Sequence, residues 1–224
     1  SKIDYMMKKL FFVLIFLLLS GNSLGADCSS IKVNPAIKIT SSFGKLSYDT
    51  SKNTEQITEQ ANYFNLVEGG DFAGGLSTVN VNFDVTINTL GRMMEDNSYC
   101  VIPTEVTLFL GFDNPVIYIS KDIPADSCQY MITLYHEQTH QQINKTTLEY
   151  FLPIFKAASK AIIKKIKPVH IQNINDMEQA TAALTKQYNS KINPLVGYIK
   201  KETLLQQKRL DNPENYKFEG NLCP

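Results

Sequence analysis

The 224-residue sequence has no excess charge of either sign, because its 22 lysines and arginines balance its 22 aspartates and glutamates. Proteins that bind nucleic acid or an anionic membrane through their overall charge carry a positive excess, so the composition gives no support to either function. Hydrophobic residues make up 43% of the chain and charged residues 20%, which is typical of a globular protein. Nor does any internal repeat or low-complexity stretch indicate a repetitive or disordered architecture.

Long hydrophobic runs are scarce, and the longest, Leu10–Leu19, has about ten residues. About 20 residues are needed to cross a bilayer, so this run does not predict a membrane anchor. It follows Lys8 and Lys9 and precedes small residues up to Gly25, with Ala26 as the alternative cleavage point; this pattern is typical of a secretory leader. We therefore expect residues 1–25 to be upstream sequence and a cleaved signal peptide. The mature protein is expected to be secreted or periplasmic, without stable membrane insertion.

Cysteine is rare, and its four copies contain no CxxC pair. A metal site built from cysteines is therefore not indicated. An even number of cysteines in an exported protein favours two disulfides, and four cysteines allow three pairings. Of these we favour Cys100–Cys128 together with Cys28–Cys223, which would tie the two ends of the mature chain to each other.

The first half of the mature chain, residues 26–123, has the pattern of strands and loops. Residues 77–88 alternate apolar and polar side chains, as a half-buried strand does. Residues 106–110 and 116–120 flank a Gly-Phe-Asp-Asn-Pro sequence, which predicts a hairpin with a five-residue loop. Residues 54–66 have the weaker pattern of a short helix.

The second half, residues 124–224, is expected to be helical. Asp126 or Ser127 can cap a helix that continues to about Lys167 with a kink at Pro153. A further helical region covers about residues 176–209, with an interruption near Pro194, and a terminal turn begins at residue 211. Together the two halves predict a single α+β domain over residues 26–224.

Histidine is the scarcest of the reactive residues, and two of the three copies stand in the sequence His136-Glu137-Gln138-Thr139-His140. This HExxH motif lies on the first predicted helix, where residues four apart are about 40° apart around the axis and one turn along it. Both imidazoles can therefore reach one metal ion, and Glu137 stands on the flank of that face, where it can deprotonate a water. Zinc accepts imidazole nitrogen and is the metal that we expect.

These residues resemble the zincins, which are HExxH metallopeptidases. The stretch from Cys100 to Pro153 is similar to a bacterial group of predicted secreted zinc-dependent proteases of poorly defined function, and so is the ending from Leu210 through Tyr216 to Cys223. The resemblance implies a zincin-like fold, in which an edge strand beside the active-site helix pairs with extended substrate. Residues 116–120 are the candidate for that strand.

A catalytic zinc needs a third protein ligand, and here the sequence departs from the best-known patterns. Thr146 stands where the metzincin motif has a histidine, and no aspzincin GTxxD occurs. A glutamate from a following helix remains, so Glu202 is the first candidate, followed by Glu178 and then by His170. Asn144, one turn after His140, is expected to support the site without binding the metal.

The function predicted from these residues is a secreted zinc-dependent metallopeptidase that cleaves peptide bonds, with His136, His140 and Glu202 as metal ligands and Glu137 as general base. Its partner would be a peptide or protein substrate. Two alternatives stay open: a hydrolase of cell-wall amide bonds, and a non-enzymatic disulfide-stapled envelope protein in which the HExxH motif is a relict or a structural site. The sequence does not predict an oligomeric state.

Overall fold

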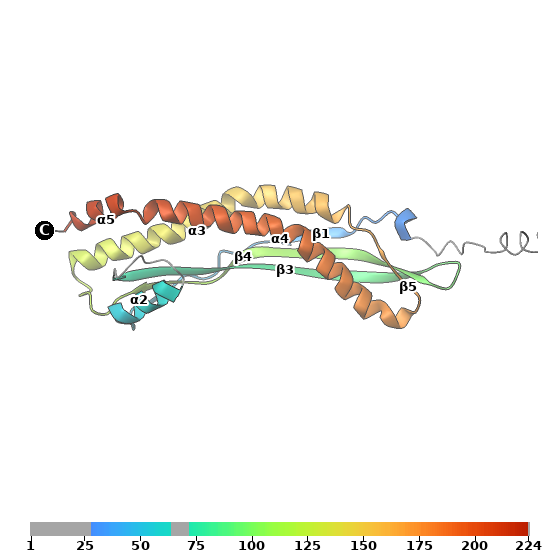
Figure 1. Ribbon diagram of the computed structural model, residues 1–224, viewed down its shortest axis with the longest axis horizontal. Coiled ribbons are helices and arrows are strands. Elements are labelled where there is room, and N and C mark those ends of the chain that lie inside the picture. The colour runs from blue at the N-terminus through green and yellow to red at the C-terminus, as the bar shows by residue number, and fades with distance from the viewer. Residues whose placement is uncertain (1–27, 64–71, 224) are drawn as a thin grey trace, which may run out of the picture.

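A computed structural model describes residues 28–63 and 72–223, so the expected leader lies outside the described residues (Figure 1). The strands are β1 (Ala36–Thr40), β2 (Ser47–Asp49), β3 (Gly75–Met93), β4 (Tyr99–Ile119) and β5 (Val169–Ile171). The helices are α2 (Thr54–Tyr63), α3 (Cys128–Ile163), α4 (Met177–Leu210) and α5 (Pro213–Gly220), with short 3-10 turns at Cys28–Ser30 and Ile174–Asp176. The expected α+β class, with a strand-rich first half and a helical second half, is confirmed.

The long strand β4 is the centre of the sheet. It pairs with antiparallel β3 along one edge, from Tyr99 opposite Met93 to Ile119 opposite Gly75. Along its other edge lie antiparallel β5 and then, in parallel, β1 and β2. Within the described residues β3 pairs with β4 alone, so β3 is an edge strand.

The predicted hairpin at residues 106–120 is wrong, because both segments belong to the unbroken strand β4. The pairing continues through the supposed loop, with Gly111 opposite Asn82 and Asp113 opposite Asn80. A side chain at Gly111 would meet the backbone oxygen of Ser42 at 2.4 Å. The absence of a side chain at this glycine therefore lets the segment that connects β1 to β2 pass close to β4. The turn-forming residues therefore mark where one neighbour leaves β4 and the next one joins it.

Both expected disulfide pairings are also wrong, since the bonds are Cys28–Cys100 and Cys128–Cys223. Cys100 stands at the start of β4 and Cys128 follows its end. A 21-residue strand separates them by roughly 65 Å at about 3.3 Å per residue, far beyond the reach of a disulfide. The error follows from the hairpin, which would have brought these two cysteines together.

Helix α3 begins with the side chain of Ser127, which accepts a hydrogen bond from the Tyr130 backbone N–H at 3.0 Å. It contains Pro153 and ends at Ile163, four residues before the predicted end. Helix α4 runs through Pro194 without the expected interruption, and the expected terminal turn is helix α5, capped by Asn212. None of the described helices has the length and apolar character needed to cross a membrane.

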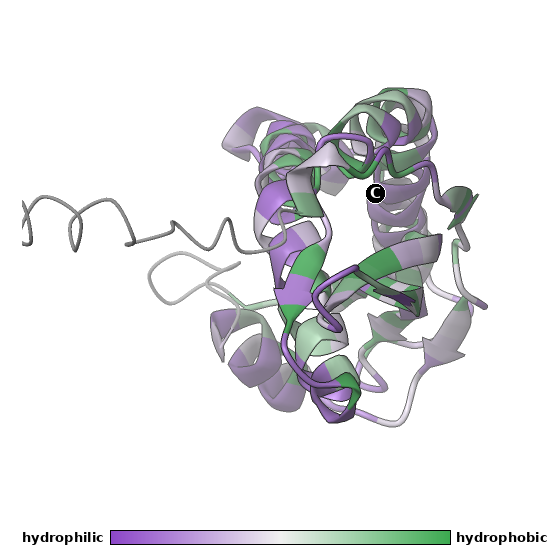
Figure 2. Ribbon diagram, turned by 90° about the vertical axis from the view of Figure 1, so that its right-hand side faces the viewer, coloured by the Kyte–Doolittle hydropathy of each residue, from purple (hydrophilic) through white to green (hydrophobic). Residues whose placement is uncertain are grey.

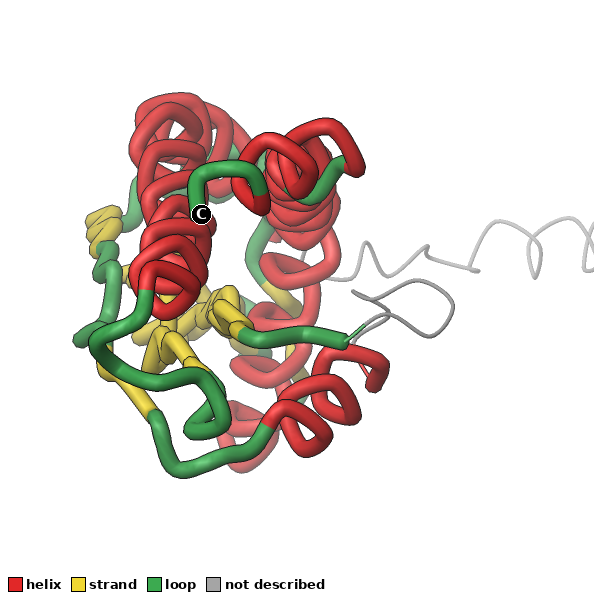
Figure 3. The backbone as a smooth tube through the Cα atoms, turned by 90° about the vertical axis from the view of Figure 1, so that its left-hand side faces the viewer, coloured by secondary structure: helices red, strands yellow, loops and turns green. Residues whose placement is uncertain are grey.

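The two long helices run in opposite directions, and α4 crosses the β3–β4 ribbon diagonally toward the start of α3 (Figure 1). Viewed along the long axis, the strands lie between the upper helices and the short α2 below (Figure 3). Hydrophilic and hydrophobic residues alternate along the helices (Figure 2). Helices α2, α3 and α4 therefore have one side that can be buried against the strands and another that faces solvent.

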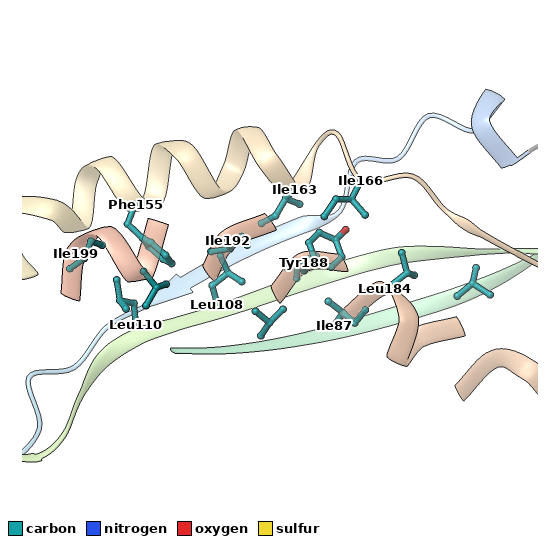
Figure 4. Close-up of a cluster of buried hydrophobic side chains, with 14 of the residues drawn as sticks. Ile87, Leu108, Leu110, Phe155, Ile163, Ile166, Leu184, Tyr188, Ile192 and Ile199 are labelled. Atoms are coloured by element: carbon teal, nitrogen blue, oxygen red, sulfur yellow. The ribbon is translucent and has the colours of Figure 1, made fainter. Parts of the chain in front are cut away.

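The main core lies where α3 and α4 cover the sheet (Figure 4). Leu108 and Leu110 of β4 point toward Ile192 and Ile199 of α4, and the Phe155 ring of α3 meets the Phe83 ring of β3 edge-on at 6.0 Å. Burial of each such side chain contributes about 1.5–3 kcal/mol, so this layer holds α4 in place along α3.

Tyr188, at the middle of this core, is fully buried, and its hydroxyl has no hydrogen-bond partner among the described residues. Burial raises the pKa of its phenol to about 12. We expect Tyr188→Phe to increase the free energy of unfolding by about 1 kcal/mol, because it removes an unpaired buried hydroxyl and leaves the ring. Urea unfolding monitored by circular dichroism measures this change. In the comparison variant Tyr188→Ala, loss of the ring should lower the free energy of unfolding by about 3–5 kcal/mol. A lower free energy of unfolding in Tyr188→Phe would contradict the prediction and would mean that the hydroxyl has a partner such as a buried water.

Candidate metal centre

Three side chains from two distant parts of the chain converge at the end of the molecule that holds the start of α3. His136 and His140 lie one turn apart on α3, and Asp211 follows the last residue of α4. The two Nε2 atoms are 3.1 Å apart, and Asp211 Oδ1 lies 3.1 Å from Nε2 of His136 and 2.8 Å from Nε2 of His140. Among the described residues these three form the group that can hold a metal ion.

The other nitrogen of each imidazole is engaged by an outer partner. His136 Nδ1 lies 2.9 Å from a carboxylate oxygen of Glu219 on α5, and Nδ1 of His140 is hydrogen-bonded to Oε1 of Gln207 on α4. The Gln207 amide donates to the carbonyl oxygen of His140 at 3.0 Å and to Oδ1 of Asn144 at 2.7 Å. Since the amide nitrogen is thus assigned as donor, Oε1 accepts the proton from Nδ1. Both Nε2 atoms are left to bind a metal.

The spacing of the three donor atoms fits a divalent transition metal. Around a tetrahedral ion with bonds of about 2.1 Å, donor atoms stand roughly 3.4 Å apart. The observed separations of 2.8 to 3.1 Å are shorter by a few tenths of an ångström, a difference that small side-chain rotations would remove. Two imidazoles and one carboxylate are a donor set that suits zinc and its neighbours in the first transition row.

Asp211 is held as a carboxylate by its neighbours. Burial opposes its ionisation, but hydrogen bonds from His136, His140 and Tyr216 outweigh burial and bring its pKa well below the usual range. The Tyr216 hydroxyl donates to Asp211 Oδ1 at 2.9 Å, and the Tyr216 ring stacks on His136 with 5.3 Å between centroids. The Asp211 side chain is therefore an anionic ligand whose orientation is fixed by Tyr216 on one side and by the two histidines on the other.

Glu137 is buried beside the cluster, against the start of β3. A side chain at Gly75 would come within 2.7 Å of its Cγ, so this glycine makes room for the glutamate, and the backbone of Ser77 hydrogen-bonds to it. Burial raises the pKa of Glu137 to about 7, against the opposing charges of His140 and His136. A carboxylate with a pKa near neutrality can take up and release a proton at physiological pH.

The cluster opens on a cleft of about 330 Å³. One wall is β3 from Gly75 to Val81, and the other is a stripe of α4 that runs from Lys200 to Asp211. The lining also includes His136, Glu137, His140 and Tyr216. A metal held by the three donors would therefore face this cleft with its remaining coordination position, as in catalytic rather than closed structural sites.

None of the three expected third ligands belongs to the cluster: among the described residues it is Asp211, and not Glu202, that lies with His136 and His140 in the group that could hold a metal ion. Glu202 lies on α4 five residues before Gln207, which turns it about 140° away from the side that faces the histidines. Glu178 is exposed in the first turn of α4. His170 lies on β5, where its Nε2 is 2.9 Å from the Ser98 hydroxyl. The expected supporting role of Asn144 has a structural basis in its bond to Gln207.

The strand expected beside the active-site helix is wrong as well. Val116 pairs with Thr78 of β3 on one side and with Ser47 of β2 on the other, and residues 116–118 are interior to the sheet. The edge strand at the cleft is β3. Glu219, Tyr216 and Asp211 were missed because nothing local relates them to the HExxH motif; the one signal was the resemblance of the ending that contains Asp211-Asn212-Pro213.

Comparisons of the chain with family models, with curated proteins and with solved structures give no match.

Replacing Asp211 tests the composition of the centre. Asp211→Asn keeps the shape of the side chain but removes its charge, so we expect the affinity for Zn²⁺ to fall roughly 100-fold or more. Isothermal titration with Zn²⁺ measures this affinity. Glu202→Gln, an equivalent change on α4 nine residues before Asp211, should leave the affinity within about twofold. Equal losses in the two variants, or none in Asp211→Asn, would contradict the assignment.

Metal affinity should also depend on pH. Burial alone would lower the pKa of His136, but its hydrogen bonds to Asp211 and Glu219 raise it to about 9, and the pKa of His140 is raised as well. Since a metal binds neutral imidazole, protons compete with it below pH 9. We expect the affinity for Zn²⁺ to rise about tenfold per pH unit for each proton released, and to level off near pH 9. Glu219→Gln removes one of the carboxylates that raise the pKa of His136, so in this variant the affinity should reach its plateau at lower pH. An affinity for Zn²⁺ that does not change between pH 6 and 9 would contradict binding at these imidazoles.

Proposed function

We propose that this protein is an exported zinc-dependent peptidase with a zincin-like active site. The observation that carries the proposal is the three-donor cluster of His136, His140 and Asp211, which opens on a cleft with a buried glutamate at its side. A structural zinc site has four protein ligands and no open position, whereas hydrolytic sites keep three ligands and a neighbouring base. This arrangement also favours catalysis over the non-enzymatic alternative.

The chain's own residues have distinct parts in the proposed reaction. When bound, zinc would supply a Lewis acid that polarises the scissile carbonyl and lowers the pKa of water. Glu137 accepts the proton of the attacking water and passes it to the leaving amine. His136, His140 and Asp211 hold the metal, while Glu219 and Gln207 keep the imidazoles oriented. Tyr216, which lines the cleft, donates its hydroxyl proton to Asp211 and so holds this ligand in place.

A peptide substrate is favoured by the wall of the cleft. Seven consecutive residues of β3, from Gly75 to Val81, line it, so the cleft follows the edge of a strand. An extended peptide can pair with such an edge through main-chain hydrogen bonds, which is the usual way that sheet edges bind peptides. A cell-wall amide remains the second candidate substrate for the same chemistry.

Export is supported by the two disulfides, which are typical of an oxidising compartment. The proposal of a cleaved leader in residues 1–25 rests on their sequence alone.

Glu137→Gln tests the proposal. The amide keeps the size of the side chain but cannot accept a proton, so we expect kcat/KM on a library of internally quenched peptides to fall by about 10²–10⁴. The content of bound zinc should stay unchanged. The control is Glu149→Gln on the same helix, where the glutamate is half exposed and lies 3.9 Å from Lys145; it should keep full activity. Hydrolysis that survives in Glu137→Gln would contradict the assigned base, and a zinc-loaded wild type that cleaves no peptide would contradict the peptidase itself.

A further inference from the structure

The cleft extends well beyond the metal centre, and its far end carries a single cation. Its α4 wall consists of Lys200, Thr203, Leu204 and Gln207, with Asp211 directly after the helix. Lys200, Leu204 and Gln207 are three or four residues apart and so form one stripe, with Thr203 beside Leu204. From Asp211 to Lys200 this wall measures about 16 Å at 1.5 Å per residue. On the β3 wall, Ser77 to Val81 measures about 13 Å at 3.3 Å per residue.

The two walls have similar lengths. Near the other end of the crossing, Thr181 of α4 and Thr89 of β3 share a hydrogen bond of 2.8 Å. From that pair, Lys200 lies about 28 Å along α4 and Val81 about 26 Å along β3, and both residues line the cleft. The metal centre and Lys200 therefore stand at opposite ends of one cleft, at a distance that an extended peptide covers in about four or five residues.

Apolar side chains line both walls of the cleft. Val79 and Val81 line it from β3 and Leu204 from α4, where Leu204 is 45% exposed. An exposed leucine that faces a cleft gains free energy when a hydrophobic side chain covers it. This stretch is therefore suited to an apolar side chain of a ligand.

Lys200 has no partner within the part of the chain that the structure describes. It is exposed, and it forms no hydrogen bond or ion pair with any described residue. Among the described residues that line the cleft, it is the one lysine or arginine. A carboxylate that reaches the far end of the cleft would complement it.

We propose that the cleft between β3 and α4 selects peptides with an apolar residue near the scissile bond and a carboxylate four or five residues away, which pairs with Lys200. The carboxylate is that of an Asp or Glu side chain or of a chain terminus. That the ligand is a peptide rests on the proposed function; the selectivity itself is a property of this cleft and can be measured without turnover.

Peptide binding to the metal-loaded Glu137→Gln protein tests the selectivity. Fluorescein-labelled eleven-residue peptides with a central Leu carry Glu or Gln at the fourth or fifth position on either side. A second set ends at the fourth or fifth position after the Leu in a free carboxylate or an amide. We expect the carboxylate peptides to bind about fivefold more tightly than their neutral partners, as measured by fluorescence anisotropy at low salt. The set with the larger difference identifies the source of the carboxylate.

Neighbouring residues supply matched controls. Lys200→Glu should abolish or reverse the preference for a carboxylate, while Lys201→Glu, the same change one residue away from the cleft, should keep it. Leu204→Asp should weaken binding of every peptide in the sets about tenfold, whereas Leu205→Asp, at a similarly exposed leucine that does not line the cleft, should not.

The outcomes separate this proposal from the peptidase proposal. Equal effects of Lys200→Glu and Lys201→Glu, or no peptide binding at all, would overturn the selectivity. Selective binding to Glu137→Gln, together with a wild type that hydrolyses none of the bound peptides, would retain the selectivity and overturn the peptidase.

Discussion

The antiparallel packing of α4 along α3 is the constraint on which the candidate site depends. Helix α3 brings His136 and His140 together by itself, but Gln207 and Asp211 reach them only if α4 lies in one register beside α3. That register is set far from the site, by a buried stripe of α4 against the sheet: Ala180, Leu184, Tyr188, Ile192, Val196 and Ile199. A shift of one turn would move the third donor by about 5.4 Å, enough to break the cluster.

The last helix depends on a different kind of restraint. Helix α5 has no buried residue, so hydrophobic burial does little to keep it in place. It is tied instead through Cys223 to Cys128 at the start of α3, and through Glu219 and Tyr216 to His136. Because the disulfide and the histidine lie on the same helix, two turns apart, the covalent bond holds the Glu219 carboxylate close to the imidazole that it orients. The same bond limits the freedom of α5 in the unfolded chain, which lowers the entropy cost of assembling the site.

Local pattern predicted local structure well, and pairing at a distance poorly. Alternation in residues 77–88 predicted β3, and the spacing of the HExxH motif predicted that both imidazoles share one face of α3, because period and spacing are properties of a single element. The hairpin failed because Gly111-Phe112-Asp113-Asn114-Pro115 has the composition of a turn, while its neighbours keep it extended. Glu202 lies outside the cluster for a related reason. Helix packing decides which acidic residue of a later segment reaches the two histidines, and the sequence between His140 and Asp211 does not encode that packing in any short pattern.

The charges of the cluster explain why it can be buried at all. His136 and His140 lie among three carboxylates, those of Glu137, Asp211 and Glu219. The two imidazoles compensate these carboxylates when both are protonated, and the raised pKa of each histidine reflects that compensation. A divalent cation on neutral imidazoles carries the same two positive charges, so exchange of two protons for one metal ion leaves the net charge of the site unchanged. Burial of the carboxylates therefore costs about the same free energy in the protonated form as in the metal-bound form. The protonated cluster thus already has the arrangement of side chains that a metal would require.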